Sequence, residues 1–265
     1  MAPKKNDLKI EIGRCFGEFI GTAFFLFMGV GGAVNLINNT TAPLQDFAIP
    51  FCFGFSLFVN VFIWAGISGG VLNPAITIAL TLTDPNNYSW IKGIAYIVCQ
   101  LLGALIGSWF IDLVQPGGPN GATMLGNGVS IAQGLFLEVF ATSVLTMTVL
   151  FISGDNYNKA FGVGMALFVS ALCAGPYTGA SLNPARTFGP AIVAKEFGRA
   201  HWIYYIGPIL GSLLAAGYWH ILRQLGVVDY PAKKGTQHVC NNCDCNNCNC
   251  SNNDRKKNDE ENQIH

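Results

Sequence analysis

Long apolar stretches separated by short polar segments run along most of this chain. Six of them are close to 20 residues, the length at which a helix crosses the roughly 30 Å hydrocarbon core of a bilayer. These stretches cover residues 15–37, 47–67, 93–114, 131–152, 160–177 and 202–222. The pattern predicts an all-α membrane protein with six transmembrane helices.

Two shorter apolar runs lie between predicted spans, within residues 68–90 and 178–201. Each follows the same frame, SGGVLNPAIT at 68–77 and TGASLNPART at 178–187. Asn suits the N-cap of a helix, and Pro suits its first position, where a missing N–H costs nothing. Runs of about ten residues reach only half of the hydrocarbon thickness. We therefore predict two half-helices, opened by Asn73-Pro74-Ala75 and by Asn183-Pro184-Ala185.

Three landmarks recur in the same order and indicate an internal repeat. They are a glutamate within an apolar run (Glu18 and Glu138), the Asn-Pro-Ala frame, and an apolar stretch that opens with tyrosine (Tyr96 and Tyr204). Their offsets are 120, 110 and 108 residues. Each half then holds three spans and one half-helix. An odd number of spans inverts the second half in the membrane, an architecture that places a transport site near the midplane.

Composition supports the membrane as the solvent and narrows the function. Hydrophobic residues make up 51% of the chain, charged residues only 11%, and the mean hydropathy is +0.39. The formal net charge is zero, which gives no reason to expect a nucleic-acid partner. We find no nucleotide-binding loop, catalytic triad or HExxH-type metal motif, so we expect a passive conduit with no cofactor and no enzymatic activity.

The paired frames, one glutamate in the first span of each half, and Gly207-Pro208 in the last span resemble the aquaporin family over about residues 10–225. The resemblance implies an aquaporin fold, a homotetramer, and a pore centre formed by the two Asn-Pro-Ala motifs. It implies that Arg186 is the selectivity-filter arginine, and that Glu18 and Glu138 support the loops before the half-helices. A proton-relay role for the glutamates is the alternative, since buried carboxylates in membranes are usually functional.

The same resemblance assigns further filter positions by their spacing from the motifs. It implies a filter of Phe53, Ala171, Ala180 and Arg186. Ala171 stands where water-selective members usually have His, and Val71 departs from a common His in the first frame. Thr187, Ala191 and the Tyr204-Tyr205 pair are instead typical of water channels. We expect a water channel that excludes ions and protons and also passes small neutral solutes.

Two alternatives remain open at this point. One is a facilitator of glycerol, urea or hydrogen peroxide; the other is a structural membrane protein with a closed pore. The distribution of Lys and Arg places both termini in the cytoplasm, with Lys195 and Arg199 outside. The membrane is expected to be the plasma membrane or that of a vesicle or vacuole. The outer loop carries overlapping glycosylation patterns at Asn38 and Asn39.

The sequence divides into a cytoplasmic segment (1–13), a channel domain (14–226, with repeats at about 14–115 and 130–226) and a polar tail (227–265). The Asn-rich composition of the tail predicts disorder. Its clustered cysteines predict either a soft-metal site or lipidation, because disulfides are disfavoured in the cytoplasm. They are Cys240, Cys243, Cys245, Cys248 and Cys250.

Overall fold

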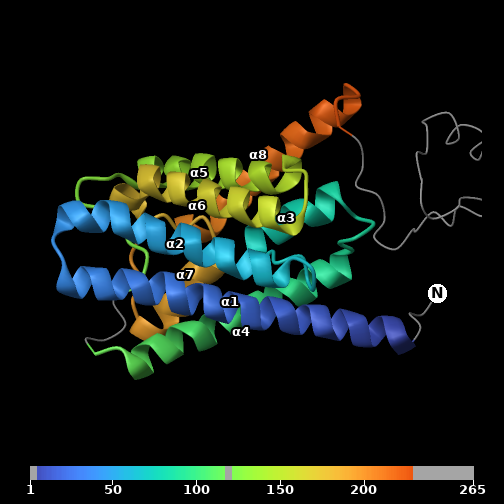
Figure 1. The fold of residues 1–265 in the computed structure, drawn as a ribbon. Coiled ribbons are helices and arrows are strands. Elements are labelled where there is room, and N and C mark those ends of the chain that lie inside the picture. Colours follow the sequence, from blue (N-terminus) through green and yellow to red (C-terminus); the bar gives the residue numbers. More distant parts are fainter. Residues whose placement is uncertain (1–4, 117–120, 229–265) are drawn as a thin grey trace, which may run out of the picture. The chain divides into compact units, whose positions relative to one another are not determined.

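The computed structural model describes residues 5–116 and 121–228, without the side chains of residues 5–7 and 42. The described chain is helical, and its eight helices appear in Figure 1. Six are long: α1 (Lys5–Asn39), α2 (Ala42–Trp64), α4 (Trp90–Val114), α5 (Ile131–Phe151), α6 (Asn156–Thr178) and α8 (Ile203–Gln224). Two are short: α3 (Pro74–Thr83) and α7 (Pro184–Ala194). All six long helices have the length and hydropathy to cross a membrane, so the predicted fold class is confirmed.

The predicted spans are each found, and most of the helices extend beyond them. The first helix begins at Lys5, ten residues before the predicted span, and it continues without a break past residues 13 and 14. Its polar first turns are compatible with a helix that projects beyond the apolar layer. The fifth span, the shortest in the prediction, is a full helix of 23 residues.

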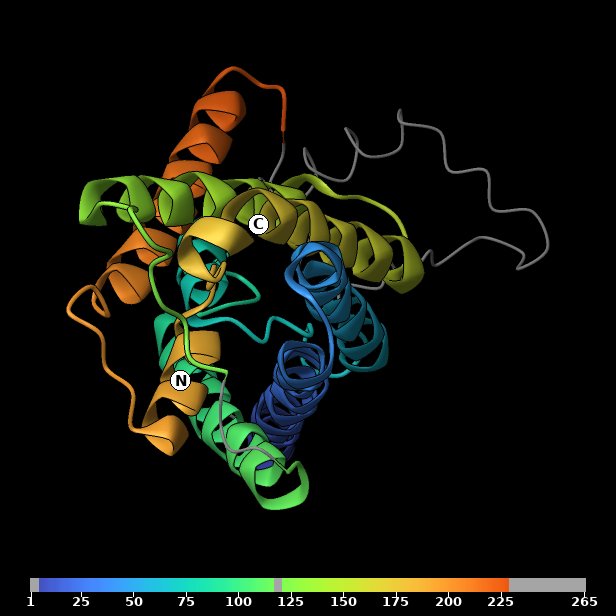
Figure 2. The same ribbon diagram turned by 90° about the vertical axis from the view of Figure 1, so that its left-hand side faces the viewer.

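The two halves of the repeat exchange their half-helices. In the first half α1 packs against α4, and in the second half α5 packs against α8 in the equivalent way. Helix α3 of the first half, however, packs against α8 of the second, while α7 of the second packs against α4 of the first. Figure 2 views the bundle nearly end-on and shows the long helices around the segments that lead into α3 and α7.

Helices α2 and α6 form the other main contact between the halves, and two glycines let them approach closely. A Cβ atom at Gly54 would lie 2.9 Å from the carbonyl oxygen of Gly164. Conversely, a Cβ atom at Gly164 would lie 2.7 Å from the carbonyl oxygen of Gly54. Because the close contact is with backbone, a side chain at either position would force the helices apart.

The outer surface of the bundle is apolar, as a lipid environment requires. Large hydrophobic side chains are exposed on every long helix, among them Phe24, Phe62, Ile91, Phe140, Phe161 and Leu214. Polar side chains are instead concentrated inside, where Glu18, Gln100 and Glu138 have no exposed surface. This inversion of the arrangement in water-soluble proteins is the physical basis for placing the chain in a membrane.

Candidate functional site: the central pore

The short helices begin where the Asn-Pro pattern predicts. Asn73 and Asn183 are N-caps in extended conformation, and proline follows each of them at the first helical position. The Oδ1 atom of Asn73 accepts a hydrogen bond from the backbone N–H of Ala75 at 3.0 Å, and that of Asn183 accepts one from Ala185 at 2.9 Å. Each cap satisfies one backbone donor, and the remaining donors give the helix start a partial positive charge.

The same two asparagines connect the halves of the repeat. Nδ2 of Asn73 donates to the carbonyl oxygen of Leu182 at 2.9 Å, and Nδ2 of Asn183 donates to that of Leu72 at 2.9 Å. The two motifs therefore meet inside the protein, with each half-helix start tied to the loop that precedes the other.

Leu72 and Leu182, which accept these bonds, have unusual backbone conformations. Both have φ of +51°, in the left-handed region that branched side chains rarely adopt. Each is held from both sides: its carbonyl accepts from the asparagine of the other half, and its N–H donates to a buried glutamate. The N–H of Leu72 bonds Glu18 Oε2 at 2.8 Å, and that of Leu182 bonds Glu138 Oε2 at 2.8 Å.

Glu18 receives three further donors besides Leu72. They are the Ser68 hydroxyl at 2.6 Å and the Val71 N–H at 3.1 Å, both to Oε1, and the Gln100 amide at 2.8 Å to Oε2. The sequence did not identify Gln100, which also bonds Thr77 of α3. An amide inside an apolar stretch was the available signal. Gln100 has no counterpart in the second half, where Pro208 occupies the equivalent position.

Glu138 occupies the equivalent place in the second half. Its Oε1 accepts from the Thr178 hydroxyl at 2.7 Å and from the Ser181 N–H at 2.9 Å. Each of these hydrogen bonds brings a donor to the carboxylate, as in the first half. The carboxylate thereby holds the backbone that leads into the second Asn-Pro-Ala motif.

A narrow, partly enclosed cavity lies between the two halves. Its polar lining comes from Asn73, Asn183, Ser181 and Arg186. Apolar side chains form the rest: Phe25, Phe53, Leu57, Val71, Ile76, Leu145, Val163, Leu167 and Ala180. Of the expected filter residues, Phe53, Ala180 and Arg186 therefore line the same space. Ala171, on α6, is 3% exposed and does not belong to this lining.

Arg186 is held in a fixed orientation at this cavity. Its Nη1 donates to the carbonyl oxygen of Gly121 at 2.7 Å, and its guanidinium carbon lies 4.6 Å from the centre of the Phe53 ring. The side chain is almost completely buried, and its Nε atom has no hydrogen-bond partner among the described residues. The guanidinium therefore contributes a fixed positive charge to the lining of the cavity.

A chain of hydroxyl groups supports the loop that anchors Arg186. Thr187 Oγ1 is 2.7 Å from both Thr123 Oγ1 and Ser181 Oγ. Ser181 Oγ in turn donates to the carbonyl oxygen of Asn183 at 3.0 Å. Thr123 follows Gly121 by two residues, so these bonds join the Gly121 loop to the second motif. The sequence analysis did not predict this chain of hydroxyl groups, because Thr123 and Thr187 are 64 residues apart.

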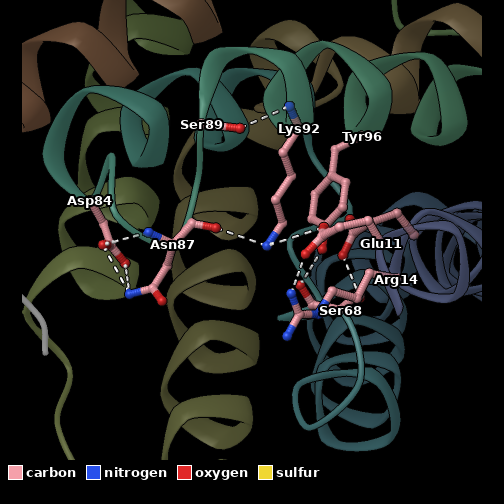
Figure 3. A network of polar contacts seen from close by, with 9 residues as sticks. Glu11, Arg14, Ser68, Asp84, Asn87, Ser89, Lys92 and Tyr96 are labelled. Carbon is pink, nitrogen blue, oxygen red and sulfur yellow. Dashed lines mark hydrogen bonds and ion pairs between the residues drawn. The ribbon is translucent and has the colours of Figure 1, made fainter. Parts of the chain in front are cut away.

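At the other end of the first half-helix, a polar network joins α1 to the segment between α3 and α4 (Figure 3). Lys92 Nζ donates to the carbonyl oxygen of Asn87 at 2.8 Å and is 3.8 Å from Glu11 Oε2. Asn87 Nδ2 donates to the carboxylate of Asp84, which caps the end of α3. Glu11 is also paired with Arg14. The first turns of α1 are thereby tied to the end of α3.

Tyr88 belongs to the same region and contacts the entrance to the first motif. A Cβ atom at Gly69 would overlap its hydroxyl oxygen. Burial is the main cause that raises the pKa of Tyr88, with the charges of Glu18 and Asp84 adding to it, so the phenol stays neutral. The ammonium group of Lys92 lies over the Tyr88 ring, 4.9 Å from its centre.

The five tail cysteines, Cys240, Cys243, Cys245, Cys248 and Cys250, lie outside the described residues. Within residues 5–116 and 121–228, no group of three or more His, Cys, Asp and Glu side chains could hold a metal ion. The prediction of a metal site in the tail therefore stays a prediction.

Comparisons with known proteins agree with the geometry of the pore. Residues 6–219 match the major intrinsic protein family. Aquaporin-1 of Rhizophagus irregularis is 67% identical over 244 residues, which cover 91% of this chain and 87% of that protein. Aquaporin-1 of Gibberella zeae is 38% identical over 235 residues, which cover 84% of this chain and 73% of that protein.

A solved structure shares the fold. The X-ray structure of the aquaglyceroporin from Plasmodium falciparum matches with a TM-score of 0.74, over 82% of this chain and 100% of that chain. The two sequences are 22% identical, so this likeness concerns the fold alone. With the family match over residues 6–219 and the fungal relatives, it leads to one conclusion: the chain belongs to the major intrinsic protein family and is a multi-pass membrane channel of the aquaporin type.

Proposed function

We propose that this protein is a passive water channel that excludes ions and protons, and that it has no enzymatic activity. The observation that carries the proposal is the meeting of the two capped helix starts, with Asn73, Asn183 and Arg186 lining one cavity. In this proposal Pro74, Ala75, Pro184 and Ala185 form the first turns that hold the two caps in place.

Electrostatics accounts for the exclusion of cations. Each helix start carries roughly half of a positive elementary charge, and the two starts face a common space of low dielectric constant. Arg186 adds a full positive charge in the same cavity. A cation that enters loses hydration and meets repulsion, whereas a neutral water molecule loses little.

Hydrogen-bond geometry accounts for the exclusion of protons. Each asparagine amide has two N–H donors, and one of them is used by a leucine carbonyl of the opposite loop. The second donor of each amide bonds the oxygen of a passing water, whose own hydrogens then point away along the pore. Such a water cannot accept a proton from its neighbour, and proton transfer along the chain of waters stops there.

Small neutral solutes are a further class of permeant in this proposal. Ala180, which lines the cavity, and Ala171, which is buried on α6 outside that lining, place methyl groups at two of the four expected filter positions, where larger side chains would take more space. Phe53 and Arg186 supply the other two positions and are in contact. The proposed filter therefore combines a fixed positive charge with small side chains at two positions, which favours uncharged molecules such as hydrogen peroxide, urea or glycerol.

Glu18 and Glu138 act as structural supports in this proposal. Their carboxylates accept every hydrogen bond that the strained loops offer them. Further elements of the proposal are cytoplasmic termini, supported by the distribution of Lys and Arg, and a homotetramer, supported by family membership.

Osmotic shrinkage of proteoliposomes, followed by stopped-flow light scattering, tests conduction directly. We expect fast water efflux relative to empty liposomes, measurable uptake of urea or glycerol, and no K⁺ or proton conductance. A structural protein with a closed pore would instead shrink at the rate of the empty liposomes.

A further inference from the structure

We propose that Gly29 of α1 is a positioning residue for the selectivity filter, because it lets the Phe53 ring lie against α1 and so sets the width of the filter. This inference rests on the proposed function of Phe53 and Arg186 as filter residues. It adds a specificity-determining position that does not itself line the cavity.

The Phe53 ring occupies the place where a side chain at Gly29 would lie. A Cβ atom at Gly29 would come within 2.8 Å of Phe53 Cδ1 and 3.1 Å of Cε1. Real Cβ atoms essentially never show contacts under 3.0 Å, so the ring would have to move. One edge of the Phe53 ring therefore occupies the space that a methyl group at residue 29 would take.

The other neighbours of the ring determine where it would go. Phe25, one helical turn before Gly29, packs edge to face against the Phe53 ring, with ring centres 6.4 Å apart. The guanidinium of Arg186 covers one face at 4.6 Å. The cavity between the two halves borders the ring as well. Because a methyl group at Gly29 would push the Phe53 ring away from α1, the ring would move toward the cavity. The cavity would then become narrower.

Arg186 is positioned against the next residue of the same helix. Its anchor, Gly121, packs so closely on Val30 that a Cβ atom at Gly121 would overlap Val30 Cγ1. Gly29 and Val30 are consecutive in α1. The positions of Phe53 and, through Gly121, of Arg186 therefore both depend on this pair of residues. A substitution at Gly29 should therefore alter the filter while the Asn-Pro-Ala motifs stay in place.

The chain offers a matched control at Gly32, three residues further along α1. A Cβ atom there would lie 2.9 Å from Cys52 Sγ, so it crowds the same two helices by a similar amount. Cys52 is the neighbour of Phe53 in α2 but does not line the cavity. Gly29→Ala and Gly32→Ala thus impose comparable crowding, and only the first acts on a filter residue.

We would purify the parent, Gly29→Ala, Gly32→Ala, Phe53→Leu and Gly29→Ala/Phe53→Leu as full-length chains. Each would be reconstituted at measured protein density, and water and urea permeability per channel would be recorded by stopped flow. We expect Gly29→Ala to lose urea permeability several-fold, with a smaller loss for water, so that the urea-to-water ratio falls. Gly32→Ala should keep the parental ratio.

The double variant separates filter geometry from general packing. In the Phe53→Leu background no aromatic edge meets the new methyl group, so Gly29→Ala should leave the ratio unchanged and should also restore any loss of folded yield. An equal change in Gly29→Ala and Gly32→Ala, or an undiminished effect of Gly29→Ala in the Phe53→Leu background, would overturn the inference. A parent that passes no water at all would contradict the proposed function, which is a distinct outcome.

Discussion

Asn73 and Asn183 are related by the pseudo-symmetry of the repeat, and each fixes the loop of the opposite half. The two cross-connections have the same length, 2.9 Å, and the same acceptor type, a leucine carbonyl with φ of +51°. The centre of the pore is therefore held by one interaction used twice, and this symmetry makes its removal testable in two equivalent places.

Replacing Asn183 by Asp should admit cations. The carboxylate places a negative charge between the two helix starts, and it cannot donate to the Leu72 carbonyl. We expect cation currents in planar bilayers while water flux in liposomes persists. Asn73→Asp is the matched variant, and it should behave in the same way because the site is symmetric. Unchanged ion exclusion in conducting variants of both kinds would contradict the electrostatic account.

Glu18→Gln and Glu138→Gln should destabilise the fold. Each amide would direct an NH₂ group at donors that now bond a carboxylate oxygen, leaving buried groups unsatisfied at a cost of about 1–3 kcal/mol each. Thermal unfolding in detergent would show a lower midpoint for both. Glu196→Gln, at an exposed position before α8, is the control and should leave the midpoint unchanged. A proton-relay role would instead change proton flux without this loss of stability.

Thr123→Val should weaken the anchor of Arg186. The substitution keeps the shape of the side chain but removes the hydroxyl that meets Thr187, which costs about 1 kcal/mol. We expect a modest loss of stability together with a change in solute selectivity, because the Gly121 carbonyl is less firmly placed. Thr148→Val is the control, since that hydroxyl bonds only within its own helix. If Thr123→Val kept the selectivity of the parent, the chain of hydroxyl groups would have no part in positioning the filter.

Ala171→His should reduce solute flux more than water flux. An imidazole is far larger than a methyl group and Ala171 is buried, so we expect the added ring to extend into the proposed filter. Urea and water permeability of liposomes give the measurement. If parent and variant exclude urea equally, another side chain fills the space that the small residue leaves.

Local chemistry explains what the sequence made predictable. Whether Asn caps a helix that begins with Pro depends only on a few neighbouring residues. The starts of the half-helices at Pro74 and Pro184 could therefore be predicted. The cost of a buried carboxylate in a membrane likewise singled out Glu18 and Glu138. These features depend on their immediate neighbours or on the solvent alone.

Partners distant in sequence explain what was missed. Gln100 contacts Glu18 across 82 residues, and Thr123 contacts Thr187 across 64, so no spacing rule indicates either pair. The early start of α1 was missed for another reason. Its first turns carry polar residues such as Glu11 and Arg14, and an apolar pattern marks the part of a helix within lipid, not its full length.

The exchange of half-helices between the repeats imposes an order on biogenesis. When α3 leaves the ribosome, its main long-helix partner α8 has not been synthesised, and the carbonyl that receives Asn73 belongs to a residue 109 positions later. The first half can insert its spans but cannot complete its own pore wall. Assembly of the conduit must therefore wait for the last span to enter the bilayer, which makes late C-terminal truncations that remove α8 damaging to the first repeat as well as to the second.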